Sequence, residues 1–324
     1  MGWFDRLLVR LTIASPRFFI RWVSNRYIAG TTTTDAIGAI ERLSEKGCCS
    51  TVDVLGEEVD DLEGTEYFQT VYRTMIEAIR DNKYDANLSI KPTAFGIHLD
   101  EAEGMNAIES LIRVANEAGL FVRLDMEDHH VTDVTIAVID EMRSRGLFNV
   151  GTVLQSRLHR TFDDITALCE RHGPDADIRL CKGVYLEPSE VAATDRGEIT
   201  ERLKTSITLA LEGGAYTAIA SHDDEVINHS LAELARLGMG PSVSDPRTPA
   251  ATAGPGKGPG YEFQMLLGVR GDLRKRLISA GHRVRIYVPF GEQWYEYSIR
   301  RLKENPTVAR HIVKALLLPW TNRP

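Results

Sequence analysis

Eight short apolar or β-branched runs alternate with longer segments of helical spacing, and this alternation most constrains the fold. The runs are CCSTVDVL (48–55), NLSIKPT (87–93), LFVRLDME (120–127), NVGTVLQS (149–156), DIRLCKG (177–183), YTAIASHD (216–223), YEFQML (261–266) and RVRIYVPF (283–290). Helical spacing is clear at 103–119 and 224–238. Because each parallel strand needs a crossover helix, we predict an α/β fold, a (β/α)8 barrel of the TIM type. A doubly wound open sheet is the alternative.

The composition is that of a globular chain, with 43% hydrophobic and 26% charged residues among 324. A net charge of −8 argues against a general nucleic-acid binder, which needs a basic surface to compensate phosphates. The four cysteines show no C-x-x-C spacing, and adjacent Cys48 and Cys49 make a poor disulfide framework. We therefore expect a reducing, cytoplasmic compartment. No run reaches the roughly 18 apolar residues of a membrane span.

Two segments differ from the rest of the chain. Residues 1–30 interleave aromatic and aliphatic side chains with arginines and lack a signal-peptide cleavage pattern. We expect a helical arm there, which either packs on the main domain or contacts a membrane surface. Residues 240–260 are rich in Pro and Gly and predict a flexible insertion on the face away from the chemistry. The predicted domains are therefore the arm (1–30) and a catalytic barrel (31–324) that carries this insertion.

Polar side chains recur at the same end of the predicted strands. They are Lys91, Asp125, Gln155, Lys182, His222 and Tyr287. Each one taken singly is consistent with a solvated loop residue, but the set predicts an active site, because TIM barrels collect theirs at the C-terminal strand ends. In RLCKGVYLEP (179–188), Arg179 and Lys182 bring two positive charges beside Gly183 and Tyr185, which favours an anionic ligand.

The cluster DMEDHH (125–130) leaves a metal site open. Asp, Glu and His are the ligands of catalytic zinc or manganese, and Asp125 and Glu127 alternate along the predicted strand so that they can converge. The sequence has neither H-x-H nor H-E-x-x-H there, and we expect His129 and His130 in the first turn of the next helix. A metal-dependent barrel hydrolase or lyase is nevertheless retained as an alternative function.

The segment YEYSIRRLKENP (295–306) predicts a helix with an anion-binding face. Tyr297, Arg300 and Arg301 stand at i, i+3 and i+4 and share one side of it. Arginine forks bind carboxylates in bidentate fashion, and Tyr287 can wall an apolar pocket beside them. A small molecule with a carboxylate and a hydrocarbon ring or chain, such as an amino acid, fits this description. The alternative is a basic last turn that complements the helix dipole.

Several of these segments together resemble the proline dehydrogenase family. IYVPFGEQWYEYSIRRLKEN is similar to its Y-x-x-R-R signature region, and RLCKGVYLEP to its fifth-strand segment. NLSIKPT, VRLDMED, TVLQS, IASHD and EFQMLLGVR follow in the family's order, and NRYIAG resembles its N-terminal entry sequence. The resemblance covers roughly residues 25 to 306.

The resemblance implies a distorted (β/α)8 barrel that binds FAD without a Rossmann fingerprint, with the final helix over the barrel mouth. It also implies oxidation of L-proline to Δ1-pyrroline-5-carboxylate by hydride transfer to FAD, the first step of proline catabolism, with electrons passing to a membrane quinone. Peripheral contact with the inner face of the cell membrane would follow. No aldehyde dehydrogenase domain follows residue 324, so we expect the monofunctional bacterial form. Hydroxyproline is the competing substrate within the family, and Tyr287 favours proline.

The resemblance also assigns roles to residues at matching positions. Asp125 and Tyr185 match the positions regarded as catalytic. The substrate-binding positions are Lys91, Leu266, Tyr287, Tyr297, Arg300 and Arg301, and the FAD-binding positions are Met126, Gln155, Arg179, Lys182, Gly183, Val184, Ser221 and His222. No metal ligand is implied.

Overall fold

The computed structural model describes residues 20–21, 24–247 and 260–304, the last five without their side chains. Eight parallel strands form a closed barrel in sequence order, and β8 pairs with β1. The strands are β1 (Cys49–Val54), β2 (Ala86–Ile90), β3 (Val122–Leu124), β4 (Val150–Gln155), β5 (Asp177–Cys181), β6 (Tyr216–Ala220), β7 (Tyr261–Leu266) and β8 (Val284–Phe290). All eight predicted strands are confirmed, although the third is shorter than expected. Closure of the sheet excludes the doubly wound alternative.

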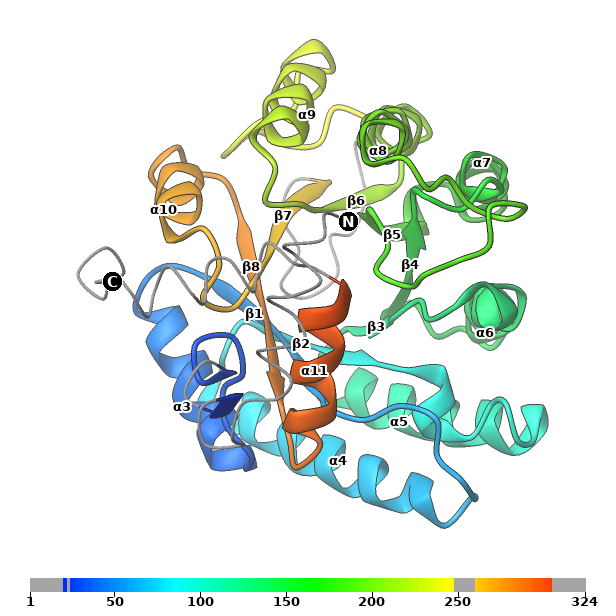
Figure 1. Ribbon diagram of the computed structural model, residues 1–324. Coiled ribbons are helices and arrows are strands. Elements are labelled where there is room, and N and C mark those ends of the chain that lie inside the picture. The colour runs from blue at the N-terminus through cyan, green and yellow to red at the C-terminus, as the bar shows by residue number, and fades with distance from the viewer. Residues whose placement is uncertain (1–19, 22–23, 248–259, 305–324) are drawn as a thin grey trace.

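Helices surround this ring of strands (Figure 1). They are α3 (Thr33–Ser44), α4 (Gly64–Asn82), α5 (Glu101–Glu117), α6 (Thr132–Ser144), α7 (Thr161–His172), α8 (Arg196–Glu212), α9 (Asp224–Arg236) and α10 (Gly271–Ser279), with 3-10 turns η1 (Pro92–Phe95), η2 (His129–Val131) and η3 (Gly173–Asp175). Side-chain caps start several helices: Asp195 accepts from the backbone of Glu198 in α8, and Asp223 from that of Glu225 in α9. These caps fix where each loop from the barrel mouth ends.

The final helix, α11 (Trp294–Glu304), follows β8 directly and crosses the middle of the ring in Figure 1. Its Tyr297 is buried against Ile28 and Leu55, and the hydroxyls of Ser298 and Ser24 lie 2.6 Å apart. The segment before α3 therefore holds α11 over the C-terminal strand ends. This confirms the expected position of the last helix. Most of the predicted arm, residues 1–19 and 22–23, lies outside the described residues.

The apolar core lies between the strands and the helices. Outward-facing strand residues such as Val284, Ile286 and Val288 of β8 are fully or nearly fully buried. They alternate with Arg285 and Tyr287, which face the barrel interior, because successive strand side chains point to opposite faces. The apolar surface that is buried therefore lies between the strands and the helices, and the barrel interior contains polar groups.

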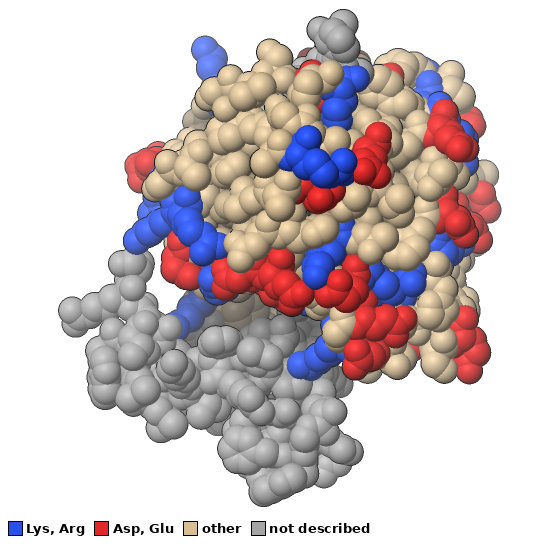
Figure 2. Space-filling model, turned by 90° about the horizontal axis from the view of Figure 1, so that it is seen from above, with Lys and Arg blue, Asp and Glu red and all other residues tan. Residues whose placement is uncertain are grey.

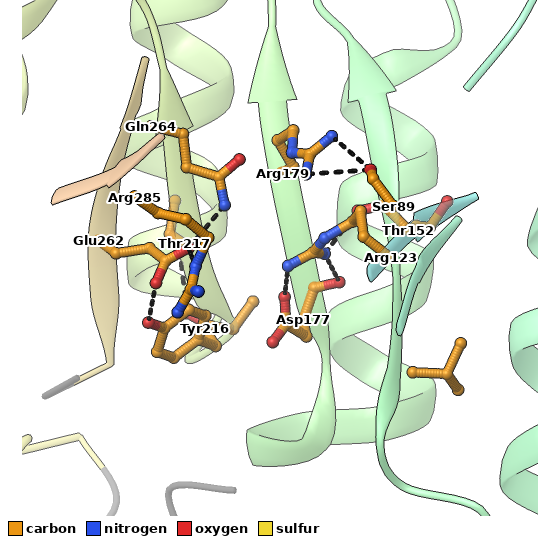
Figure 3. A network of polar contacts seen from close by, with 12 residues as sticks. Ser89, Arg123, Thr152, Asp177, Arg179, Tyr216, Thr217, Glu262, Gln264 and Arg285 are labelled. Carbon is orange, nitrogen blue, oxygen red and sulfur yellow. Dashed lines mark hydrogen bonds and ion pairs between the residues drawn. The ribbon is translucent and has the colours of Figure 1, made fainter. Parts of the chain in front are cut away.

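Charged side chains fill the lower part of the barrel interior (Figure 3). Arg123 of β3 pairs with Asp177 of β5 across the intervening strand, and it also donates to the carbonyl of Thr152 at 2.8 Å. Gly151 makes room for it, since a Cβ there would lie 2.8 Å from Arg123 Nη1. Contacts between strands that are not neighbours must cross the lumen. The interior is therefore a network of buried ion pairs.

A second buried pair joins β7 and β8. Arg285 Nε donates to Glu262 at 2.8 Å, and neither side chain is more than 2% exposed. Glu262 also accepts from Tyr216 at 3.0 Å and Gln264 at 2.6 Å. Burial raises the pKa of Glu262, but Arg285 and then Arg283 outweigh it and lower the pKa to about 2. The carboxylate is therefore ionised throughout the physiological range.

The ends of the predicted insertion lie at the base of the barrel. Arg247 donates to the carbonyls of Leu211 at 2.8 Å and Gly260 at 3.1 Å, and pairs with Asp245 at 2.7 Å. Gly260 directly precedes β7, so the contacts of Arg247 lie at the N-terminal strand ends, away from the mouth. Residues 248–259, on which the prediction of a flexible insertion mostly rests, lie outside the described part of the chain.

The surface carries charges of both signs. In Figure 2, basic side chains are interspersed with acidic ones, and no continuous basic area covers the face shown. This mixture of charges is consistent with the net charge of −8. Across the described ranges, no helix is long and apolar enough to cross a membrane. Cys48, Cys49, Cys169 and Cys181 are free thiols.

Breaking the Arg123–Asp177 pair should destabilise the barrel. In Asp177→Ala the guanidinium of Arg123 stays buried without its counter-charge, so we expect the free energy of unfolding to fall by about 3–5 kcal/mol. Denaturant unfolding followed by circular dichroism measures this. The control is Asp81→Ala, which removes an ion pair whose members are 54% and 63% exposed and should hardly shift the midpoint. Equal shifts in both variants would contradict a stabilising interior network.

Candidate active site

The predicted polar residues lie together at the barrel mouth. Lys91, Asp125 and Lys182 directly follow β2, β3 and β5, whereas Gln155 and Leu266 end β4 and β7. Tyr287 lies within β8 and not at its end. The barrel is staggered, and the register pairs Tyr287 with Leu266, so that its side chain is level with the end of β7. Tyr287 was expected at the end of its strand, and this expectation is wrong.

Asp125 is the centre of the site. Its Oδ1 accepts from Arg179 at 2.5 Å and from Ser89 at 2.6 Å, and its Oδ2 accepts from the hydroxyl of Tyr287 at 2.8 Å. Burial raises the pKa of Asp125, but Arg179, Lys91 and these hydrogen bonds outweigh it and hold the pKa below its ordinary value. Side chains of three strands bind this one carboxylate, which is therefore ionised and fixed in orientation.

The phenol of Tyr287 stays protonated. Burial raises its pKa well above the ordinary value, and the negative charges of Asp125 and Asp53 raise it further. The guanidinium of Arg179 lies 5.6 Å from the ring centroid, within cation–π range. Tyr297 of α11 also contributes to the raised pKa of Tyr287.

Lys91 is a buried cation with its own counter-ion. Its Nζ lies 2.5 Å from Asp53 of β1, and the side chains are 9% and 0% exposed. Burial lowers the pKa of Lys91, but Asp53, Asp125 and Glu127 together raise it above its ordinary value. The ammonium is therefore charged at neutral pH.

Gln155, at the end of β4, and Gly183, just after β5, lie in close contact. The amide of Gln155 donates to the carbonyl of Glu127 at 2.5 Å, while its buried Oε1 has no hydrogen-bond partner in the described part of the chain. Gly183 has φ of +91°, and a Cβ there would lie 2.5 Å from that same oxygen. Met126 is buried next to Glu127. An acceptor buried beside an open backbone suits a ligand with an N–H donor.

Lys182, Ser221 and His222 surround the start of α9. Lys182 Nζ donates to Thr200 at 2.7 Å and to Asp223 at 3.0 Å, and Ser221 Oγ accepts from the backbone N–H of Asp223 at 3.2 Å. Burial and then Arg270 lower the pKa of His222 to about 4, so it is neutral. His222 Nε2 accepts from the backbone of Leu266 at 2.9 Å, and the proton is therefore on Nδ1.

The remaining predicted residues lie on the loop after β5 and on α11. Tyr185 lies on the loop between β5 and α8, and its hydroxyl donates to Glu57 at 3.4 Å. Val184 on the same loop is 39% exposed. Arg300 and Arg301 lie on α11, but their side chains lie outside the described part of the structure. The structure thus locates the helix of the predicted carboxylate clamp without testing the clamp.

The carboxylates of the metal alternative have separate partners. Glu127 accepts from the backbone and hydroxyl of Thr93 at 3.0 and 2.5 Å, whereas Asp125 binds Arg179. His129 begins a short turn before α6, close to the predicted position, and binds Glu187 at 2.5 Å. Within the described ranges, no group of three or more His, Cys, Asp and Glu side chains could hold a metal ion.

Sequence reasoning missed several residues that complete the site. They include Asp53, Ser89, Thr93, Glu57 and Asp223. A signal for two of them exists: Asp53 and Ser89 interrupt apolar strands at alternating positions, which marks them as inward-facing. Their partners could not be assigned because these depend on how the barrel closes.

Comparison with known proteins adds independent findings. A family model described as proline dehydrogenase matches residues 36–313. A proline dehydrogenase of Deinococcus radiodurans is 34% identical over 300 residues, which are 91% of this chain and 90% of that protein. Proline dehydrogenase 1 of Bacillus subtilis subsp. natto is 31% identical over 307 residues, 95% of each chain.

A solved structure is also similar in fold. Proline utilization A from Bdellovibrio bacteriovorus, inactivated by N-propargylglycine, matches with a TM-score of 0.77 and 21% identity. The match covers 88% of this chain and 33% of that one, so this chain spans about a third of that protein's length.

Glu127 makes stability depend on pH. Burial raises its pKa from 4.5 to about 7, so the folded protein binds this proton more tightly than the unfolded chain. The wild type should lose on the order of 3 kcal/mol of stability from this group as pH rises from 4.5 to 7. Glu127→Gln removes this titration, so its melting temperature relative to wild type should rise with pH across that window. A difference that stays constant with pH would contradict the raised pKa.

Proposed function

The chain belongs to the proline dehydrogenase family, and on this premise we propose that it oxidises L-proline to Δ1-pyrroline-5-carboxylate with FAD as its cofactor. The observation that carries the proposal is the ionised Asp125 at the centre of a mouth lined by Arg179, Tyr287 and Lys91, beneath the helix that bears Arg300 and Arg301. Proline has a carboxylate, an amine and an apolar ring, and the site offers cations, hydroxyls and aromatic walls to match them.

The carboxylate of proline would bind between α11 and the barrel. Arg300 and Arg301 follow Tyr297 at i+3 and i+4 on α11, and Lys91 supplies a third cation from β2. Tyr287, Tyr297 and Leu266 would enclose the ring. This arrangement fixes the reacting carbon relative to the cofactor, which is a proximity effect.

The residues near the mouth fit FAD. When bound, FAD accepts the hydride that leaves the substrate carbon. The Oε1 of Gln155, which has no hydrogen-bond partner among the described residues, suits an N–H donor of the flavin, and the left-handed Gly183 with Val184 allows close backbone approach. Arg179 and Lys182 would compensate negative charge, and His222 offers a neutral Nδ1–H donor. Met126 and Ser221 complete the proposed contacts.

We assign positioning and proton handling of the substrate amine to Asp125 and Tyr185 together. A cationic amine does not give up hydride readily, so the substrate nitrogen must be neutral at the transition state. Asp125 is a weak base because its pKa is held below the ordinary value, and it serves mainly to orient Tyr287 and Arg179. Tyr185, paired with Glu57, supplies a hydroxyl and a carboxylate at the rim of the site.

Tyr287 also favours proline over hydroxyproline. Its hydroxyl is committed to Asp125 at 2.8 Å, so it cannot turn away to admit a substituent on the ring without breaking that bond. Electrons would pass from the reduced cofactor to a membrane quinone. Peripheral membrane contact of an otherwise cytoplasmic protein would serve that step.

Anaerobic titration with L-proline tests cofactor, substrate and redox role together. We expect the purified protein to show a flavin absorption band near 450 nm, roughly where oxidised flavins absorb, and proline to bleach it. Hydroxyproline should bleach it much less at equal concentration. Protein that neither carries nor takes up FAD would refute the proposal, and flavin that proline does not bleach would refute the substrate.

The carboxylate clamp can be tested with Arg300→Lys and Arg301→Lys. Each variant keeps the charge and loses the bidentate fork, so we expect KM for proline to rise by roughly 10- to 100-fold, corresponding to about 1.5–3 kcal/mol. Steady-state kinetics and the flavin-to-protein ratio measure this, and the ratio should not change. The matched control is Arg276→Lys on α10, whose side chain is 54% exposed. Its KM should not change. Unchanged KM in both clamp variants would refute the assignment.

A further inference from the structure

The end of the DMEDHH segment has no role in the proposed reaction, yet His129 makes a specific contact. Its ring Nδ1 lies 2.5 Å from one carboxylate oxygen of Glu187, and its backbone N–H donates to the other at 3.0 Å. Both oxygens of Glu187 are thus bound by a single residue. His129 follows β3, and Glu187 belongs to the loop between β5 and α8, so the contact bypasses β4.

Glu187 has a buried side chain, although its neighbours Leu186 and Pro188 are exposed. Its side chain is 3% exposed, whereas Leu186 beside it is 86% exposed. A buried carboxylate is costly unless it is paired, and His129 provides that pairing. The loop is therefore held against the β3 end by Glu187.

The same loop carries the residues proposed to bind FAD. Arg157, after β4, donates to the carbonyl of Tyr185, and its backbone N–H donates to the carbonyl of Lys182 at 3.3 Å. Glu187 adds an attachment on the far side of Tyr185. Gly183 and Val184 lie between the two contacts of Arg157, at Lys182 and Tyr185, and Glu187 fastens the loop just after them, so their position depends on where the loop is fastened.

We propose that His129 and Glu187 form a latch that positions the cofactor-binding stretch 182–185 against the β3 end, where Asp125 and Met126 lie. The proposal rests on the proposed FAD-dependent function. His129 and Glu187 are positioning residues: they act through the loop and hold the flavin in the site.

The test is the rate of flavin release from the purified holoenzyme, followed as the rise in flavin fluorescence after dilution. In His129→Leu the side-chain donor is lost, and we expect release to be about 10- to 100-fold faster, the effect of one hydrogen bond to a charged group. His129→Asn places an amide N–H where Nδ1 stands and should restore slow release. Glu187→Ala should release flavin as fast as His129→Leu, and the double variant no faster than either.

The matched control is His130→Leu. The ring of His130 lies 3.9 Å from that of His129. His130 is nevertheless exposed, and its backbone N–H donates to the side chain of Asp128. Its release rate should equal that of the wild type. Wild-type release from His129→Leu or Glu187→Ala would refute the latch, as would fast release from His129→Asn. A chain that holds no flavin would refute the proposed function instead. If flavin is held and bleached by proline but released at the same rate by all variants, only the latch is refuted.

Discussion

Pairing of buried charges is the constraint on which the rest of this structure depends. Inside the barrel, Arg123 with Asp177 and Arg285 with Glu262 are nearly free of solvent contact. Removing one member leaves an unpaired charge where water cannot reach it, which costs far more than the pair itself contributes. The apolar side chains are on the outer faces of the strands, and their burial against the helices drives folding. The charged side chains inside the barrel favour this arrangement of strands because each charge meets its partner there.

The candidate active site lies above this network and has the same kind of paired charges. Arg179 with Asp125 and Lys91 with Asp53 repeat the pairing of the lower layer, but they lie at the mouth, where a ligand can join them. The lower pairs hold the strands at fixed separation, and the upper pairs are therefore fixed before any ligand arrives. Preorganised charges of this kind stabilise a transition state without rearrangement, which is the main electrostatic term in catalysis.

The sequence predicted the eight strands and the polar side chains at their C-terminal ends, because hydrophobic periodicity and strand-end polarity are local signals. It did not predict that Tyr287 lies inside β8 or that Asp53 pairs with Lys91. Both depend on the stagger of the closed barrel, which sets the level of one strand against the next. Ser89 was missed for the same reason, since its partner Asp125 comes from the neighbouring strand. The two arginines of α11 stay predictions, although their helix lies where the proposed clamp requires it.

The site combines rigid and loop-borne parts, and each suits its task. Asp125 receives three hydrogen bonds from side chains of strands, so the charge nearest the proposed reacting centre cannot move without breaking the barrel network. The proposed cofactor contacts at Lys182 to Tyr185 are instead on the loop after β5, where Arg157 contacts the carbonyls of Lys182 and Tyr185. A loop can open for a large cofactor to enter, but it must then be fastened to give the same geometry each time. Buried Glu187, bound through both oxygens to His129, is the contact in this loop best placed to do so.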